Sequence, residues 1–95
     1  MSQVEFVSDR KFTIRLDYCS PGGMTNKVNI AKKILKIAFP NAEIKCEMVS
    51  QAEAFEIYVV TEDGMETLVH SRLKGDGYLD KVGCSKLFKN IQEVL

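Results

Sequence analysis

The strict alternation of apolar and polar residues between Lys11 and Tyr18 restricts the fold of this chain more than any other feature. Side chains at every second position of an extended chain point to the same side. Here one side is apolar and consists of Phe12, Ile14, Leu16 and Tyr18. The pattern predicts a strand that is buried on one face, and such a strand belongs to a sheet that is covered by a second layer.

A turn and then a helix are predicted directly after this strand. The sequence SPGG at 20–23 contains residues that favour turns and interrupt regular structure. Pro40 should end the helix, because its ring disfavours helical geometry at the preceding residue. Between these two points, apolar residues recur at helical spacing in one stripe, made of Met24, Val28, Ala31, Ile34, Leu35, Ile37 and Ala38. The solvated side is predicted to carry Lys27, Lys32, Lys33 and Lys36.

The sequence after Pro40 predicts three more strands and a second helix. Alternation returns first, with an apolar side made of Ala42, Ile44, Cys46 and Met48. Strand, helix and strand in this order indicate a right-handed parallel unit. A hairpin follows, formed by a strand with Phe55, Ile57 and Val59, the glycine-containing turn TEDGME and the returning strand TLVHS. The closing amphipathic helix has Asp80 or Ser85 as its candidate N-cap, and its stripe is Leu87, Phe88, Ile91, Val94 and Leu95.

The predicted order β-α-β-β-β-α indicates a two-layer α+β sandwich within the broad α/β class. Because the first two strands are apolar on one side only, both helices are expected on the same face of a four-stranded mixed sheet. This is the minimal thioredoxin-like plan. We expect residues 1–95 to form one domain with a core from about residue 11 onward, since a chain of this length supports a single core.

Composition narrows the classes of function. The chain has 13 basic and 13 acidic residues, and this zero net charge gives no general reason to bind nucleic acid or an anionic membrane. The sequence shows neither a secretory signal nor an apolar run long enough to span a membrane, so we expect a soluble, cytoplasmic protein. The three cysteines form no close pair with metal-ligand spacing, which favours reduced thiols over a disulfide scaffold or a metal site.

Cys19 is the strongest candidate for chemistry. If the first strand is central, three loops meet at one end of the sheet, and their sequences are YCSPGG, VSQAEA and LKGDGYLD. Open α/β sheets tend to bind ligands at the carboxyl ends of their strands, and a cysteine just before a helix often has a lowered pKa. The same position also suits a small residue that only packs in the turn, and the residues alone leave both interpretations open.

The other cysteines and the single histidine have simpler interpretations. Cys46 is predicted to pack in the core, since it shares a strand face with Ile44 and Met48. Cys84 stands near the start of the last helix and is a weak candidate for resolving a mixed disulfide on Cys19. His70 is predicted to lie on the strand surface, because no carboxylate or second histidine accompanies it at the spacing of a ligand set or a triad.

The glycines of the first loop have two interpretations as well. Pro21, Gly22 and Gly23 are ordinary turn residues, and their backbone N–H groups are also suited to hold a carboxylate or phosphate. The loop is not a P-loop, because it lacks the ending Gly-Lys-Ser/Thr.

The segments YCSPGG and LVHSRLKGDGYLD resemble selenoprotein W and its relatives, the Rdx group of small thioredoxin-like proteins. The resemblance extends from about Phe12 to Leu95 and includes the segment AFEIYV. It implies a redox motif, Cys-x-x-selenocysteine or Cys-x-x-Cys, in the first loop. Cys19 matches the first position of that motif and Gly23 matches the glycine after it, but Gly22 stands where the second thiol or selenol belongs. Since glycine cannot attack a mixed disulfide, the dithiol cycle of the family does not carry over intact.

The resemblance implies two alternative functions. In the first, Cys19 works alone and forms a mixed disulfide, which an external thiol such as glutathione releases. In the second, the redox chemistry is lost and the fold binds proteins, in keeping with the partners attributed to this family, which include 14-3-3 proteins. No metal and no bound cofactor are expected. The redox loop would consist of Ser20, Pro21, Gly22 and Gly23, and contacts with a substrate or partner are expected from Gln51, Asp76, Gly77 and Tyr78.

Overall fold

The structure is a computed structural model that describes residues 11–19, 24–52, 54–76 and 81–95. It confirms the predicted order of elements. These are β1 (Phe12–Cys19), α1 (Met24–Ala38), β2 (Glu43–Val49), β3 (Phe55–Thr61), β4 (Glu66–Ser71) and α2 (Lys81–Val94). The described residues form a thioredoxin-like α+β fold with a four-stranded mixed sheet and two helices.

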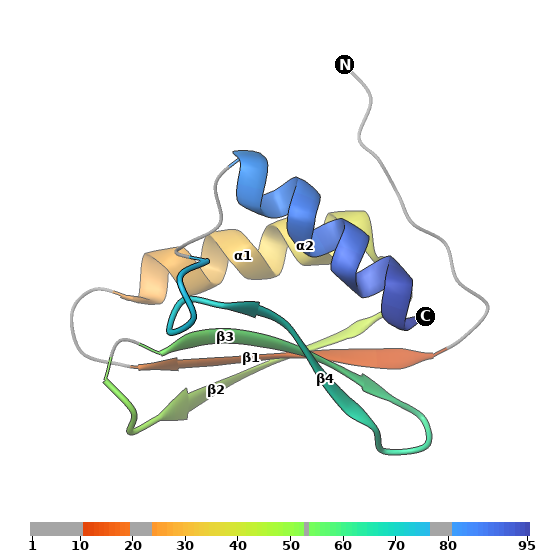
Figure 1. Ribbon diagram of the computed structural model, residues 1–95, viewed down its shortest axis with the longest axis horizontal. Coiled ribbons are helices and arrows are strands. Elements are labelled where there is room, and N and C mark those ends of the chain that lie inside the picture. Colours follow the sequence, from red (N-terminus) through yellow and green to blue (C-terminus); the bar gives the residue numbers. More distant parts are fainter. Residues whose placement is uncertain (1–10, 20–23, 53, 77–80) are drawn as a thin grey trace.

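The sheet has the strand order β2-β1-β3-β4, so β1 and β3 are central, and the condition under which three loops were expected at one end of the sheet is met. β1 is parallel to β2 and antiparallel to β3, and β4 returns antiparallel to β3. Both helices cover the same face of the sheet (Figure 1). Because of these strand directions, β1, β2 and β4 all end at the same end of the sheet, where β3 begins. We call this the carboxyl end of the sheet.

The core lies between the helices and the covered face of the sheet. Ile14 of β1, Ile57 of β3 and Leu87 of α2 are fully buried there, as the sequence pattern predicts. Phe39, which follows α1, is also buried, and its ring contacts the rings of Phe12 and Phe88 edge to face at centroid distances of 6.0 and 5.8 Å. These aromatic contacts join β1, the end of α1 and α2.

The prediction that His70 lies on the strand surface is wrong. His70 is 4% exposed, and its ring packs edge to face against Phe55 with the centroids 5.9 Å apart. The cause is a β-bulge between β3 and β4: Ile57 pairs with His70, whereas Tyr58 pairs with Leu68, so β4 has one extra residue at this point. The bulge changes the alternation of β4 and places His70 opposite the buried Ile57.

Three further details differ from the sequence prediction. Ile37 is 38% exposed, because it follows the buried Leu35 by two residues and therefore lies about 200° around the helix. Met48 is 65% exposed, near the end of β2 at the outer side of the sheet, and does not belong to the core. Ser85 lies within α2 and is not an N-cap, while Asp80 precedes the helix and lies outside the described residues.

The face of the sheet that the helices leave uncovered carries a cluster centred on Arg15. Its guanidinium carbon lies 4.5 Å above the centre of the Tyr58 ring, and Arg15 also pairs with Asp17 at 3.1 Å and with Glu66. Burial acts to lower the Arg15 pKa, but the two carboxylates raise it on balance. These contacts connect the first, third and fourth strands on the uncovered face.

Candidate functional site

Cys19 is the last residue of β1 and lies at the carboxyl end of the sheet. Its backbone N–H donates to the carbonyl of Ala54 at 3.1 Å, and on its other side it pairs with Val49 of β2. Cys19 forms no disulfide, and the residue is partly buried. Since α1 begins at Met24, one short loop separates the thiol from the N-terminus of a helix. The backbone of Cys19 is therefore held on one side by β2 and on the other by Ala54, directly before β3, and the residue is only partly buried.

Gln51 belongs to the turn that leads into β3, and this turn is connected to Cys19. The N–H of Ala54 donates to the carbonyl of Gln51 at 3.3 Å, and the carbonyl of Ala54 accepts the N–H of Cys19. The Gln51 side chain is exposed. The structure therefore brings Gln51 to the same end of the sheet as Cys19, and its contact with a substrate stays a prediction.

The loop that follows β4 also lies at the carboxyl end. Its first residue, Arg72, donates its N–H to the carbonyl of Phe55 at 3.1 Å, next to the Ala54 carbonyl that Cys19 uses. Cys19 and Arg72 thus flank the start of β3 from its two sides, and two strand spacings put their backbones about 10 Å apart. Gly75, with a φ of 102°, gives this loop a conformation that residues with side chains rarely adopt.

A buried carboxylate holds this loop against the sheet. Glu56 lies on the uncovered side of β3 but is only 8% exposed, and it accepts hydrogen bonds from the Ser71 hydroxyl and from the Leu73 N–H, the latter at 3.3 Å. The Ser71 hydroxyl oxygen in turn accepts the Lys74 N–H at 3.1 Å. Sequence analysis did not find this network, because the position of Glu56 in an alternating strand predicts solvent exposure.

Asp76 connects the same loop to β4 and α2. Its carboxylate accepts the Ser71 N–H at 2.9 Å and the Lys86 ammonium at 2.9 Å. The Lys86 hydrogen bond, followed by that from Ser71, lowers the Asp76 pKa below its ordinary value. The predicted residue thus lies at the carboxyl end, where its carboxylate is held by these two groups, and its contact with a substrate stays a prediction.

The two other cysteines occupy different surroundings. Cys46 packs against the core, as predicted, and burial raises the pKa of its thiol, an effect that the charge of Lys32 partly opposes. Cys84 is a partly buried cysteine of α2. Its proposed contact with Cys19 is untested.

Six of the predicted site residues lie outside the described part of the chain. The first four belong to the loop between β1 and α1, and the last two follow Asp76; they are Ser20, Pro21, Gly22, Gly23, Gly77 and Tyr78.

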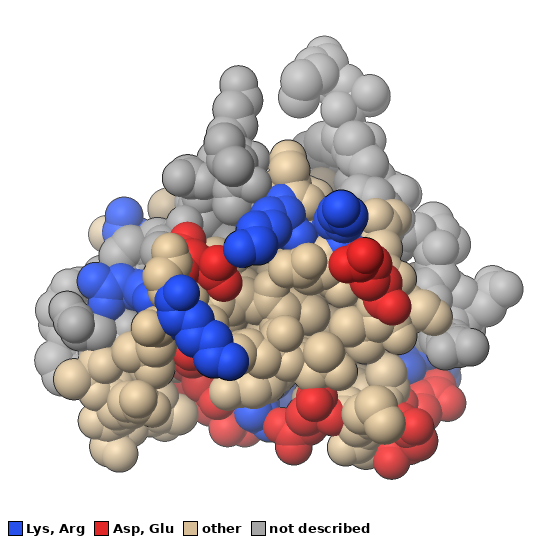
Figure 2. Space-filling model, in the orientation of Figure 1, with Lys and Arg blue, Asp and Glu red and all other residues tan. Residues whose placement is uncertain are grey.

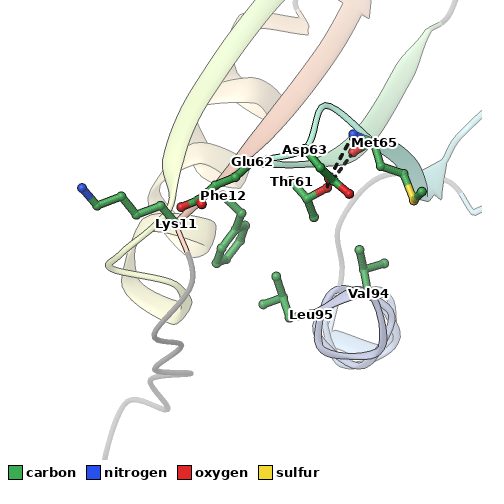
Figure 3. Close-up of a pocket in the computed structure, with 8 residues that line it drawn as sticks. All are labelled: Lys11, Phe12, Thr61, Glu62, Asp63, Met65, Val94 and Leu95. Atoms are coloured by element: carbon green, nitrogen blue, oxygen red, sulfur yellow. Dashed lines mark hydrogen bonds between the residues drawn. The ribbon is translucent and has the colours of Figure 1, made fainter.

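Figure 3 shows a pocket with a volume of about 360 Å³. Its lining includes Phe12 at the start of β1, so it lies at the opposite end of the sheet from Cys19. It is formed by the start of β1, the turn between β3 and β4 and the end of α2, and Phe12, Val94 and Leu95 supply its apolar part. Because β1 separates it from the thiol by the whole length of the strand, this pocket is not a substrate site for Cys19.

Over the described ranges, neither a metal-binding cluster nor a membrane-spanning helix is seen. Within these residues, His, Cys, Asp and Glu side chains do not gather in threes around a point where a metal ion would be held. In the same part of the chain, neither helix has the length and apolar character needed to cross a membrane.

Comparison with known proteins defines the family. A model of the Rdx family matches residues 13–93. The chain belongs to the Rdx family. Selenoprotein V of Homo sapiens is similar to this Rdx protein, with 30% identity over 92 residues. The similar region covers 97% of the Rdx chain but 26% of selenoprotein V, so the chain spans about a quarter of that relative.

Family and fold together make this Rdx chain a thioredoxin-like, redox-related protein. The matched range includes Cys19, both helices up to Glu93 and the loop after β4. The resemblance to selenoprotein W and its relatives is therefore confirmed at the level of the family.

Proposed function

We propose that this Rdx protein is a small redox protein that acts through one thiol, that of Cys19, by mixed-disulfide exchange. The observation that carries the proposal is the position of Cys19: a partly buried cysteine on a fixed strand end, shortly before a helix, at the carboxyl end of the sheet. Gly22 occupies the fourth position of the Cys-x-x-Cys pattern and has no thiol, so the second thiol of the reaction has to come from another molecule.

Glutathione is the proposed external thiol. In the forward step the Cys19 thiolate attacks one sulfur of a substrate disulfide, a new disulfide joins Cys19 to the substrate, and the other substrate sulfur leaves as a thiolate. A glutathione thiolate then attacks the mixed disulfide, which releases the substrate as a glutathione adduct and restores the Cys19 thiolate. Proteins with reactive thiols are the proposed substrates, and the cytoplasm, where glutathione keeps thiols reduced, is the proposed location.

A coupled assay tests the proposal. Reduction of a small disulfide is followed in the presence of glutathione, glutathione reductase and NADPH. The wild-type protein and its Cys46→Ser variant should be active, and Cys19→Ser should be inactive. Loss of activity in Cys84→Ser to the same extent would identify Cys84 as a resolving thiol and would overturn the single-thiol mechanism.

Restoring the second thiol provides an independent test. Gly22→Cys recreates the Cys-x-x-Cys spacing, and a thiol at that position should attack a mixed disulfide on Cys19 and shorten its lifetime. The lifetime is measured by mass spectrometry after removal of excess disulfide. An unchanged lifetime would argue that Cys19 does not work in the manner the motif implies.

The second candidate function is a binding module without redox chemistry, favoured by the absence of a second thiol at Gly22. Proteins of the 14-3-3 type are its proposed partners. Binding of a purified 14-3-3 protein to wild type and to Cys19→Ser is compared. Equal binding, together with an inactive wild type in the coupled assay, would favour this function over the first.

A further inference from the structure

Charge is unevenly distributed over this neutral protein. The chain has 13 basic and 13 acidic residues, but α1 and α2 together contain seven lysines and a single acidic residue, Glu93. The strands and loops therefore carry an excess of acidic residues. Figure 2 shows Lys and Arg side chains over the helices with a few acidic side chains beside them, and more Asp and Glu side chains along the lower edge, where the sheet lies. Zero net charge thus conceals a basic helical side.

α1 carries a second apolar stripe that faces solvent. Its buried stripe includes Val28, Ala31 and Leu35, which contact the core. Beside it, Ile30 is 55% exposed and Ile37 is 38% exposed. Ile34 lies between them, four residues after the first and three before the second, and is partly buried. Residues at this spacing form one row along a helix, so the three isoleucines make a continuous stripe.

Lysines border this outer stripe. Lys27 precedes Ile30 by one helical turn, and Lys33 follows it by one turn. Lys32 and Lys36 lie on the other side of the helix, since the first acts on the Cys46 thiol of β2 and the second donates to the carbonyls of residues 40 and 42. Since α1 contains no acidic residue, its lysine charges are not neutralised within the helix.

We propose that this outer face of α1, defined by Lys27, Ile30, Lys33, Ile34 and Ile37, binds an acidic amphipathic helix of a partner protein. Two turns separate Ile30 from Ile37, about 10 Å along the axis, which matches the spacing of anchor residues on a bound helix. The isoleucines contact the apolar stripe of the partner helix, and the lysines contact its carboxylates.

The chemistry of the face favours this occupant over a lipid surface. Helices that lie in a membrane interface carry aromatic or leucine anchors on their apolar face, whereas the outer stripe of α1 is made of isoleucine alone. The strongest apolar face of α1 is already buried against the sheet. The inference does not depend on Cys19, which lies outside this face, so Cys19→Ser should bind the same helices as wild type.

The test is an unbiased selection of helical peptides from a display library with randomised surface positions. Enriched peptides should combine an apolar stripe with an excess of Asp and Glu, and their binding should weaken as salt increases. Ile30→Ser/Ile37→Ser should reduce affinity about tenfold or more, because it removes both exposed anchors. Both positions are at the surface, so the variant should keep its fold, which is checked by circular dichroism.

Met65→Ser is the matched control, since Met65 is 63% exposed in the turn between β3 and β4, outside the proposed face. Its binding should equal that of wild type. Enriched peptides that are neutral or basic, or that bind the double isoleucine variant as well as wild type, would overturn the proposal. Binding only to vesicles of anionic phospholipid, or self-association that the double variant abolishes in sedimentation, would overturn it in favour of a membrane or a second copy.

Discussion

Glu56 shows how a single charged residue can be buried at a position that its strand pattern assigns to solvent. Its carboxylate is covered by the loop after β4 and accepts hydrogen bonds from the Ser71 hydroxyl and the Leu73 N–H. A buried carboxylate is tolerated when donors of this kind replace water. Glu56 therefore fixes the shape of a loop at the carboxyl end of the sheet, near Cys19.

Replacing Glu56 should cost more stability than replacing an exposed carboxylate. Glu56→Ala leaves the buried Ser71 hydroxyl and the part-buried Leu73 N–H without this acceptor, and we expect a loss of about 1–3 kcal/mol in the free energy of unfolding. Glu66→Ala, the control, breaks an ion pair of a half-exposed carboxylate with Arg15 and should cost about 1 kcal/mol or less. Urea unfolding measures both. Equal losses in the two variants would contradict the structural role of Glu56.

Cys46 provides a second prediction at a single residue, because burial raises its thiol pKa and Lys32 opposes this shift. Lys32→Gln removes the favourable charge, so the Cys46 pKa should rise further, the thiolate fraction at pH 8 should fall, and alkylation by iodoacetamide should slow. Lys33→Gln is the control, since Lys32 and not Lys33 is the charge that acts on the Cys46 thiol. The rate at Cys46 is measured by peptide mass spectrometry, and an unchanged rate in Lys32→Gln would contradict the prediction.

The connection between the loop after β4 and α2 depends on Asp76 and Lys86. The Asp76 pKa is lowered in the folded protein, so its contribution to stability is present above the pKa of an unfolded aspartate, about 3.9, and is lost as the pH falls below that value. Wild type should therefore melt at a higher temperature than Asp76→Asn at pH 6. The difference should shrink toward pH 2.5, and a difference that stays constant over this range would contradict the assignment.

Among the strands and helices, those features that depend on local periodicity could be predicted from the sequence. The alternation in β1 and the helical spacing in α1 gave their positions, because each side chain's exposure there follows from its neighbours in sequence. The bulge that buries His70 could not be predicted, since it depends on how β4 pairs with β3. The burial of Glu56 was equally hidden, because a loop from a distant part of the chain covers it.

Part of the candidate site could also be predicted from local patterns in the sequence. Cys19 was placed correctly at the end of β1, since the strand pattern stops there. Gln51 and Asp76 lie at the same end of the sheet, which follows from the strand order once β1 is central, and their role in binding stays a prediction. The hydrogen bonds that hold Asp76 to Ser71 and Lys86 required the folded structure, since no spacing in the sequence indicates them.

Across the whole molecule, three surfaces with different chemistry occupy different places. The carboxyl end of the sheet carries Cys19 and the loop held by Glu56, the opposite end carries a pocket with a mixed polar and apolar lining, and the outer face of α1 carries isoleucines and lysines. This separation allows a thiol reaction and a protein contact to take place on one small protein without sharing residues. The proposed thiol reaction is the central claim and can be measured directly.

The decisive measurement is the mass of the intact protein, and of its cysteine peptides, after exposure to oxidised glutathione. We predict a single glutathione adduct on Cys19, faster than any adduct on Cys46 or Cys84, and its complete removal by reduced glutathione. Absence of an adduct on Cys19, or an internal disulfide between Cys19 and Cys84 in its place, would contradict the single-thiol account.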